Sequence, residues 1–476
     1  MKLKTRFKNY RFFRISFWIL NLFLISAPLI YGQETLTVSP DGQNGFVSIQ
    51  DALDAAIPGQ TILVMPGIYR ESLVIHTPVK ITGYMSKECI LEIPQGSPAG
   101  IVIMDAAKEK GEVVIQSLTI RGQQRIQRIH NPGVVLEYKN GRSVIKVVPP
   151  ESPASRANIF SGSYLTSVDG WKIDFPEAAY VIMAGNGRTK AVELETSTGR
   201  TSISREMITE ARYIPGGWPN GIMVIQSHAS IYDCRISDLP GDGIWVGGNE
   251  SVVDIRNNIC SDNKKNGIIM AYGSEGTLSN NTLRDNTIGI SVENHKTSPF
   301  IYHNFCSGNL KSGIFYTTGA TGFAQANQVT DNAESGIFIS GGETCPTLIE
   351  NHCIKNGQDG IHLTDGTLSC ISKNNCWRNT KAGILATGKN TKCSVVNNQC
   401  RNNGTSGIVI QKGSNGYFAG NDCISNNEYG IDVKKNAGKP VLENNWFEEN
   451  PLGEISNEDP VKRRKRKALL YRRHIR

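Results

Sequence analysis

The chain has 476 residues and a formal net charge of +8, from 51 Lys and Arg against 43 Asp and Glu. The two ends supply this excess: residues 1–33 contain six basic residues, residues 461–476 contain nine, and neither segment contains an acidic one. The remaining 34–460 carries 36 basic and 43 acidic residues, a net charge of −7. A body of that sign is not built to bind nucleic acid.

Residues 1–33 predict export. Basic residues run from Lys2 to Arg14, an apolar stretch follows from Ile15 to Ile30, and Ala27 is one of several small residues after its core. This order is typical of a signal peptide. The apolar stretch is also long enough for an uncleaved membrane anchor, which needs about 17 to 25 residues. We therefore expect an extracytoplasmic protein, which is secreted, periplasmic or at the cell surface, with membrane contact at the N-terminus if the segment is retained.

Residues 34–125 predict the first coils of a β structure and a helix over its open end. The segment FVSIQDALDAA has the pattern of a short amphipathic helix with Ser48 as its cap, and the following TILVMPGIYRESLVI has the pattern of strands. Unpaired strand edges at the end of a sheet invite aggregation. A helix at this place would cover them.

Residues 126–211 interrupt the pattern. They contain PGVV at 132–135, SPASRA at 152–157, SVDG at 167–170 and a helical stretch around Ala178 to Met183. These pieces resemble a PDZ domain. The resemblance implies an inserted α+β domain in which an extended peptide joins an edge strand while loop amides hold its terminal carboxylate. By position, Gly133, Val134 and Val135 would bind protein C-terminal peptides; the alternative is a degenerate domain that only packs against the rest of the chain.

Residues 212–460 contain a repeat of about 23 residues. A Gly-Ile pair recurs every 22 to 24 residues, with its glycine at Gly221, Gly243, Gly267, Gly289, Gly313, Gly336, Gly360, Gly383, Gly407 and Gly430. Short apolar strands alternate with Asn and Gly turns, and the period is too short for two packed helices. The sequence therefore predicts an all-β solenoid of stacked coils.

Two Asn rows and one Cys row accompany the repeat. The first Asn row contains Asn258, Asn304, Asn327, Asn351, Asn398 and Asn421, with Asn374 and Asn375 near the same register. The second contains Asn263, Asn309, Asn332, Asn356, Asn379, Asn403 and Asn426. We expect their amides to hydrogen-bond from coil to coil at about 4.8 Å, the separation of strands in a sheet.

The Cys row contains Cys260, Cys306, Cys353, Cys376, Cys400 and Cys423, in line with Ile and Val positions of other coils. This alignment predicts small buried thiols, and the alternative is disulfides between adjacent coils, such as Cys376 with Cys400. One cysteine per coil, with no nearby set of histidines, predicts no metal site. We expect no cofactor.

Two segments of the chain resemble known protein families, and both resemblances point to the same fold. The stretch DGQNGFVSIQDALDAAIPGQTILVMPGIYRESLVI resembles the first coils of pectin methylesterases, and residues 213–450 resemble the carbohydrate-binding and sugar-hydrolase (CASH) repeats shared with the NosD family. The resemblance implies a right-handed parallel β-helix of the pectin-lyase type, with the PDZ-like domain inserted in it. It specifies the fold better than the function.

Several activities of related β-helix proteins are disfavoured. The sequence has no counterpart of the catalytic Gln and Asp motifs of pectin methylesterases, the Gly-His-Gly and Arg-Ile-Lys motifs of polygalacturonases, or the Asp-Pro-His-Asp motif of mannuronan epimerases. A copper-site accessory role like that of NosD has no Met or His cluster to support it.

The second residue after each repeat glycine forms a predicted outward row: Met223, Trp245, Ile269, Ser291, Phe315, Phe338, His362, Leu385, Val409 and Asp432. Such an apolar, partly aromatic stripe fits stacking on sugar rings, and the alternative is that loops or the inserted domain cover it. We expect Trp245, Phe315, Phe338 and His362 to contact the substrate.

Acidic residues and histidines lie near this row. Asp359, His362 and Asp365 share one coil and are the candidate catalytic residues, able to supply an acid, a base or a cation site. The alternative is ordinary solvated surface. Asp242 and Glu293, together with His295, lie close to the same row.

The sequence leads to two functional hypotheses. The first is an exported β-helix protein that binds an extended polysaccharide and, if it is an enzyme, acts on it as a lyase, hydrolase or esterase. The second is a non-enzymatic envelope scaffold whose PDZ-like insert binds protein C-termini. The basic tail 461–476 fits a solvated segment, and the alternative is binding to an anionic lipid, wall polymer or nucleic acid.

Overall fold

The computed structural model describes residues 35–43, 45–104, 111–122, 129–131, 133–184, 191–204, 206–208 and 219–457. The export segment 1–33 and the basic tail 461–476 lie outside these residues, so both predictions stay as they are. Within the described ranges, no helix has the length and apolar character needed to cross a membrane.

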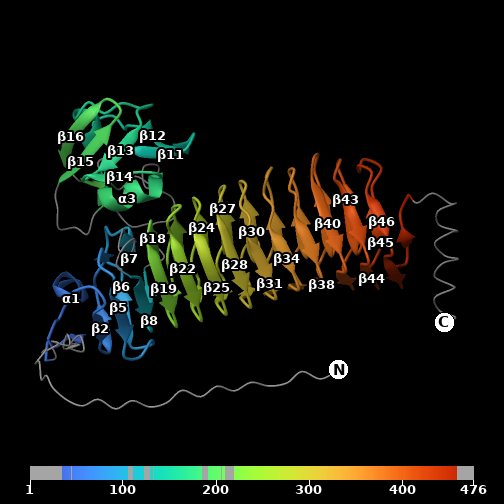
Figure 1. Cartoon of the computed structure of the whole chain (residues 1–476), viewed down its shortest axis with the longest axis horizontal. Coiled ribbons are helices and arrows are strands. Elements are labelled where there is room, and N and C mark those ends of the chain that lie inside the picture. Colours follow the sequence, from blue (N-terminus) through green and yellow to red (C-terminus); the bar gives the residue numbers. More distant parts are fainter. Residues whose placement is uncertain are drawn as a thin grey trace, which may run out of the picture. The chain divides into compact units, whose positions relative to one another are not determined.

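Most of the described chain is a solenoid of parallel strands, in which each coil adds one strand to each of three sheets (Figure 1). Sheet A contains β1 (Leu36–Val38), β2 (Thr61–Val64), β5 (Lys80–Gly83), β8 (Val113–Gln116), β19 (His228–Tyr232), β22 (Val252–Arg256), β25 (Glu275–Ser279), β28 (Ser298–Tyr302), β31 (Phe323–Gln325), β34 (Thr347–Ile349), β37 (Cys370–Ser372), β40 (Lys392–Val396), β43 (Asn415–Ala419) and β46 (Val441–Glu443).

Sheet B contains β3 (Gly67–Tyr69), β6 (Cys89–Glu92), β9 (Thr119–Arg121), β20 (Arg235–Ser237), β23 (Ile259–Ser261), β26 (Thr282–Arg284), β29 (Phe305–Ser307), β32 (Gln328–Thr330), β35 (His352–Ile354), β38 (Asn375–Trp377), β41 (Gln399–Arg401), β44 (Asp422–Ile424) and β47 (Trp446–Glu448).

Sheet C contains β4 (Leu73–Ile75), β7 (Ala99–Met104), β18 (Asn220–Ile225), β21 (Ile244–Gly247), β24 (Asn266–Ala271), β27 (Ile288–Glu293), β30 (Ile314–Thr317), β33 (Ile337–Ile339), β36 (Ile361–Leu363), β39 (Ile384–Thr387), β42 (Ile408–Gln411), β45 (Tyr429–Val433) and β48 (Gly453–Ile455). The prediction of an all-β solenoid is confirmed.

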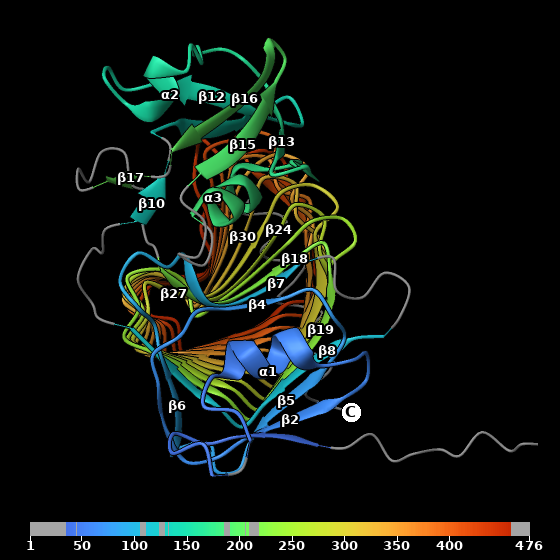
Figure 2. The same cartoon turned by 90° about the vertical axis from the view of Figure 1, so that its left-hand side faces the viewer.

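Helix α1 (Ile49–Ala55) lies across the N-terminal end of the solenoid (Figure 2). Ser48 caps it as predicted, because its side chain accepts a hydrogen bond from the Asp51 amide. The carboxylate of Glu71 accepts hydrogen bonds from the Ser48 hydroxyl and from the amides of Ile49 and Gln50, at 2.8 to 3.0 Å. The helix therefore covers the first coil with its unpaired amides satisfied.

The Asn ladders are confirmed. In the first ladder, the Asn351 side-chain amide donates to the Oδ1 of Asn374 at 2.9 Å and to the carbonyl of Ala324 at 2.7 Å. The same link repeats from Asn258 to Asn445, and Asn281, which the sequence pattern had missed, is one of its members. The second ladder runs in the same way from Asn263 to Asn450. The two ladders hold the turns on either side of sheet B in register.

The interior is apolar. The Ile that follows each repeat glycine points inward and is fully buried, and so are all six cysteines of the predicted row. All cysteines of the chain are free thiols, including Cys376 and Cys400, which face each other on adjacent strands. The prediction of buried thiols is confirmed.

Between β9 and β18 the chain leaves the solenoid and forms an α+β insert (residues 129–208, Figure 1). Its elements are β10 (Ile129–Asn131), β11 (Val135–Lys139), β12 (Arg142–Val147), α2 (Pro153–Arg156), β13 (Leu165–Val168), β14 (Trp171–Lys172), α3 (Pro176–Ala184), β15 (Ala191–Thr196), β16 (Gly199–Ser204) and β17 (Glu206–Ile208). Strands β14, β13, β15 and β16 form an antiparallel sheet, and β11 pairs with β12. That this insert is a PDZ domain stays a prediction.

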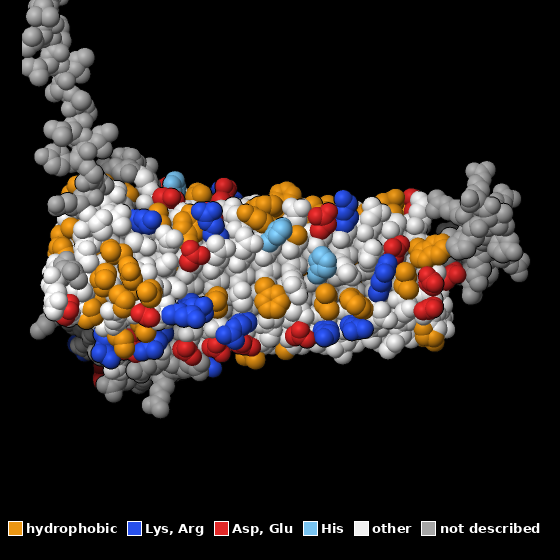
Figure 3. Space-filling model, turned by 90° about the horizontal axis from the view of Figure 1, so that it is seen from below, with side chains coloured by type: hydrophobic (Ala, Val, Ile, Leu, Met, Phe, Trp, Pro, Cys, Tyr) orange, Lys and Arg blue, Asp and Glu red, His pale blue; other side chains and the backbone are white. Residues whose placement is uncertain are grey.

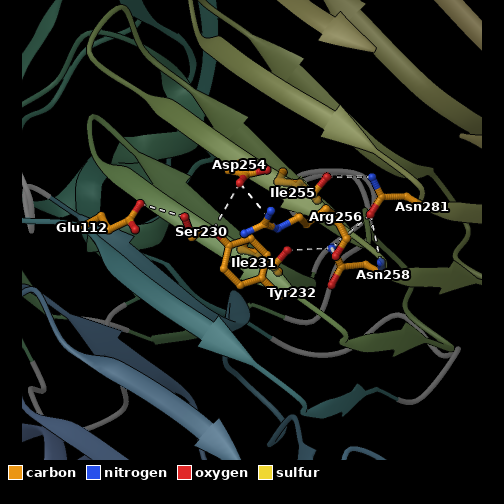
Figure 4. A network of polar contacts seen from close by, with 9 residues as sticks. All are labelled: Glu112, Ser230, Ile231, Tyr232, Asp254, Ile255, Arg256, Asn258 and Asn281. Carbon is orange, nitrogen blue, oxygen red and sulfur yellow. Dashed lines mark hydrogen bonds and ion pairs between the residues drawn. The ribbon is translucent and has the colours of Figure 1, made fainter. Parts of the chain in front are cut away.

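The outer face of sheet A is polar on β19 and β22, whereas Phe300 and Phe323 are exposed further along it. The Tyr232 hydroxyl donates to Asp254 at 3.2 Å, and Arg256 pairs with the same carboxylate at 3.6 Å while lying over the Tyr232 ring (Figure 4). Ser230 donates to Glu112 at 2.7 Å. Acidic and basic side chains intermingle on the side of the solenoid seen in Figure 3, so this side presents no field of a single sign.

Candidate functional site

The predicted outward row exists on sheet C. Met223 lies opposite Trp245 in the next strand, and the same register continues strand by strand to Asp432. Because neighbouring strands of a sheet are about 4.8 Å apart, the row is a straight line of side chains along the solenoid axis.

The first part of the row is covered. Met223 is fully buried, Trp245 is 3% exposed and Ile269 is 8% exposed, and all three share one apolar cluster with residues of the insert. The Trp245 ring lies 5.5 Å from that of Phe175 in the insert. The alternative that the insert folds over the stripe therefore holds for these strands, and Trp245 does not lie on the open part of the face.

The next aromatic residues are partly exposed. Phe315 and Phe338 stack with ring centroids 5.3 Å apart and planes 16° apart, and the His362 ring lies 4.9 Å beyond Phe338. The structure thus brings together three of the four predicted substrate-contact residues. Rings that stack on one another along the axis turn their edges outward. The stack is therefore an apolar floor with ring edges exposed.

Asp359 and His362 form a pair beside this stack. Asp359 Oδ2 lies 3.5 Å from His362 Nδ1, with the Asp359 side chain 3% exposed and that of His362 20% exposed. Asp359 Oδ1 accepts a hydrogen bond from the Ala382 amide at 3.0 Å, whereas Oδ2 and His362 Nε2 are buried and have no hydrogen-bond partner. One carboxylate oxygen of Asp359 thus accepts a hydrogen bond from the next coil, and the other faces the imidazole of His362.

Burial shifts both groups toward their uncharged forms. It raises the pKa of Asp359 to about 6, although the Ala382 amide and the Lys381 charge oppose the rise. It lowers the pKa of His362 to about 4, with a further contribution from the charge of Lys381. At neutral pH the pair therefore consists of a carboxylate and a neutral imidazole, which is a proton acceptor beside a ring that can accept or donate.

Asp365 does not join the pair. It lies in the turn after β36, is exposed, and accepts a hydrogen bond from the Ser340 hydroxyl at 2.9 Å. Its charge acts on His362 only at a distance, by opposing the lowering of the pKa of His362. The structure therefore separates the third predicted catalytic residue from the other two.

A sequence profile of the right-handed β-helix region matches residues 192–351 and 326–450, more than half of the chain. The chain belongs to the right-handed β-helix family. The candidate site of this chain lies on the outer face of sheet C, one of the three parallel sheets. No curated protein matches the chain at a significant level.

Solved structures with a similar fold share little sequence with this β-helix protein. The A-module of the mannuronan C-5 epimerase AlgE4 of Azotobacter vinelandii is 17% identical, with 87% of this chain and 93% of that chain covered and a TM-score of 0.45. A mutant of the periplasmic alginate epimerase AlgG is 14% identical, with 85% and 83% covered and a TM-score of 0.49. The Dettilon tailspike protein is 14% identical, with 86% and 68% covered and a TM-score of 0.46.

A second group of buried acids lies where the insert meets the β-helix. Burial raises the pKa values of Asp242, Glu293 and Glu177, and the charge of Lys265 acts on all three in the opposite direction. Asp242 accepts from the Asn266 backbone and side-chain amides at 2.9 and 2.8 Å, so its carboxylate links two coils. Glu177, on α3 of the insert, could not be found from the sequence, because only the packing of the insert brings it here.

His295 stands apart from both groups. It is largely exposed, and its Nδ1 lies 3.6 Å from the carboxylate of Glu343, which is also largely exposed. Over the described ranges, no three His, Cys, Asp or Glu side chains are grouped as a metal ion would require.

The predicted peptide-binding segment lies at the start of β11. Gly133 and Val134 are buried, and Val135 is the first residue of the strand. The next amide, that of Leu136, donates to the Tyr180 hydroxyl of α3 at 2.6 Å. A peptide that joined β11 on this side would have to take that donor away from Tyr180.

Proposed function

We propose that this β-helix protein is exported and binds an extended polysaccharide along the open strands β30, β33, β36 and β39 of sheet C, with Asp359 and His362 as an acid–base pair that acts on the bound sugar. The observation that carries the proposal is the pair itself. A buried carboxylate oxygen with no hydrogen-bond partner lies 3.5 Å from an imidazole whose other nitrogen also has none. Buried polar atoms are normally satisfied, and groups whose pKa is shifted by burial cluster at functional sites.

The floor beside the pair suits a sugar chain. Phe315, Phe338, His362 and Leu385 are partly exposed in four consecutive positions of the row. The positions from Phe315 to Leu385 span about 14 Å, three strand spacings. A linear polymer can lie over such a floor in van der Waals contact with the ring edges, with its hydroxyls toward the polar sides.

The charges around the pair favour an acidic polysaccharide. Lys381 and Lys412 lower the pKa of His362 and Asp365 raises it, so two ammonium groups and one carboxylate act on the imidazole. Lys381 also opposes the raised pKa of Asp359. A sugar carboxylate over β36 would meet these cations.

The reaction that fits the pair is proton transfer at the bound sugar. Two-carboxyl hydrolysis needs a second carboxyl about 5 to 9.5 Å from the first, and Asp365, the other carboxyl of the coil, is exposed and bonded to Ser340. In an elimination, Asp359 or His362 would take the proton from C5 of the sugar while Lys381 offsets the charge that develops on the sugar carboxylate. The electron pair then forms the C4–C5 double bond, the C4–O glycosidic bond breaks, and the leaving oxygen takes up a proton from water. The proposed enzyme class is therefore a polysaccharide lyase.

The test is binding and turnover on defined polymers. The purified protein is incubated with polymannuronate, polygalacturonate and a neutral glucan, and unsaturated products and reducing ends are measured. We expect binding to the acidic polymers and formation of unsaturated products. Product formation should be lost in Asp359→Asn and in His362→Gln. Binding without any product would leave a binding protein, and no binding to any polymer would contradict the proposal.

A matched pair of phenylalanines tests the surface. Phe338→Ala should weaken binding to the acidic polymer at least about tenfold, because it removes the middle of the floor. Phe323→Ala is the control, because Phe323 is 50% exposed on sheet A. Equal effects of the two substitutions would show that sheet C is not the binding face.

The scaffold function remains as the alternative proposal, with its own test. A bulky residue at Gly133 is a poor probe, because a Cβ there would lie 2.4 Å from that of Ser152 and the φ angle is +84°. Tyr180→Phe is better, because it releases the Leu136 amide while keeping the ring. If the insert binds C-terminal peptides, this substitution should strengthen capture from a C-terminal peptide library, and no capture by either form would reject the peptide-binding function.

A further inference from the structure

The insert closes one end of the row that the proposed function uses. The outward side chains of β7, β18, β21 and β24, which include Val102, Met223, Trp245 and Ile269, are at most 8% exposed and belong to the same apolar cluster as the core of the insert. A shared core of this kind holds two units in one arrangement, because separation would expose the whole cluster to water.

Directional contacts fix the position of the insert on these strands. The Phe175 ring stacks on that of Tyr272, which follows β24, with centroids 4.8 Å apart and planes 4° apart. Gln226, which follows β18, donates to Asp174 at 2.7 Å. At the far edge, Trp171 stacks on His76, which follows β4, at 5.2 Å. The insert is thus attached over the first coils of the row.

The boundary between covered and open strands falls at β27. Ser291 lies opposite Ile269 on one side and opposite Phe315 on the other, and it is fully buried. Its hydroxyl donates to Glu293 at 2.8 Å. From the insert, Glu177 reaches the same place, where its Oε2 is buried without a hydrogen-bond partner. The closed end of the row is therefore polar, whereas its floor is apolar.

Resting on the proposed function, we propose that this site takes the end of a polysaccharide chain and excludes its interior. A polymer that lies along the row from β39 toward β30 meets the insert at β27 and cannot continue over β24 and β21. Its terminal sugar then lies over Phe315, with the partly exposed carboxyls of Glu293 and Glu177 beside the terminal hydroxyls. Carboxyl groups are suitable acceptors for sugar hydroxyls.

The same geometry places the chemistry near the chain end. His362 is two strands from Phe315 in the row, which is about 10 Å at the spacing of a sheet. The acid–base pair would therefore act on a sugar close to the terminus. The products would be short and uniform in length, instead of a broad mixture from random internal positions.

The stoichiometry of binding tests end recognition without any need for turnover. The full-length Asp359→Asn protein, which should bind without converting the chain, is titrated with polymannuronate fractions of increasing length, and the number of proteins bound per chain is measured. A constant number at every length is expected. A number that rises with length would overturn end recognition while the proposed function stands, and no binding at any length would overturn both.

Blocking the termini gives a second readout. Chains with a bulky group attached at both ends should bind at least about tenfold more weakly than unmodified chains of the same length. Equal binding of blocked and unblocked chains would overturn the inference.

A substitution in the insert tests whether its docking is the cause. Phe175→Ala removes the ring that contacts both Trp245 and Tyr272, and it should allow the number of proteins bound per chain to rise with length. Phe160→Ala is the matched control, because Phe160 belongs to the insert but is 60% exposed, and its stoichiometry should stay constant. If Phe175→Ala does not fold, the length series and the chains with blocked ends, neither of which uses this variant, still test the inference.

Discussion

The Asp359–His362 pair predicts opposite effects of two substitutions on the pH dependence of stability. Burial raises the pKa of Asp359 from 3.8 to about 6, so folding takes up a proton there between these values. Burial lowers the pKa of His362 from 6.5 to about 4, so folding releases a proton there between these values. In the native protein the two changes nearly cancel between about pH 4 and pH 6.

Each substitution uncovers the effect of the remaining partner. In Asp359→Asn only His362 titrates, and its contribution to the free energy of unfolding is present above pH 6.5 and lost as the pH falls through about 4. In His362→Gln only Asp359 titrates, and its contribution is present below pH 3.8 and lost as the pH rises through about 6. At about 1.36 kcal/mol per pH unit, each change amounts to about 3 kcal/mol over its window.

Urea unfolding at a series of pH values measures these changes. The quantity to plot is the difference between each variant and the parent protein, because all other titrating groups then drop out. The difference should rise with pH for Asp359→Asn and fall with pH for His362→Gln. Two flat difference curves would show that neither group is shifted by burial, and the argument for a proton-transfer pair would fail with them.

Three further predictions concern the solenoid. Asn351→Ala removes four buried hydrogen bonds, at about 1 kcal/mol each, so the free energy of unfolding should fall by about 4 kcal/mol. Gln399→Ala is the control, because it removes an exposed amide on sheet B and should change the free energy of unfolding little. Equal effects of the two substitutions in urea unfolding would contradict the role of the Asn ladder. Gly360→Ala should destabilise the protein by about 1 to 3 kcal/mol, because the new Cβ would lie 2.6 Å from the Gly383 carbonyl oxygen. Gly342→Ala is the control, because its Cβ would meet nothing within 4 Å. Equal melting temperatures of the two variants would contradict this steric argument. In the native protein, iodoacetamide should label the exposed Cys345 and Cys370 and leave the buried Cys376 unlabelled, which peptide mass spectrometry can measure. Fast labelling of Cys376 in the native protein would show that the core opens.

The sequence predicted the solenoid in detail because a repeat converts intervals along the chain into positions in space. Once the Gly-Ile period is known, each residue is assigned to a coil and a face, and the outward row from Met223 to Asp432 follows. Asn281 and Asn286 were missed because they lie eight and three residues before Gly289, one fewer than the nine and four of the other coils, although each lies 23 residues from the next member of its row.

The coverage of the row could not be predicted in the same way. Trp245 and Phe338 occupy equivalent positions, and nothing in the repeat tells them apart. What separates them is the insert, whose residues Phe175 and Glu177 reach sheet C through a contact with no counterpart in the period. The separation of Asp365 from Asp359 could not be predicted from the sequence either. A turn with a positive φ angle at Asp365 directs the chain away from the pair after β36.

The position of Asp359 explains why its carboxylate calls for a functional role. The residue before each repeat glycine accepts a hydrogen bond from the next coil in several cases: Asn220 from the Asp242 amide, Asp242 from the Asn266 amide, and Asp359 from the Ala382 amide. Asn220 shows that an amide side chain serves this purpose without bringing a charge into the interior. An Asn at 359 would do the same, and would avoid the cost that burial imposes on the carboxylate above about pH 6. A residue that costs stability where an equivalent one would not is expected at a site of chemistry, and here it lies 3.5 Å from a neutral imidazole on the open part of the face.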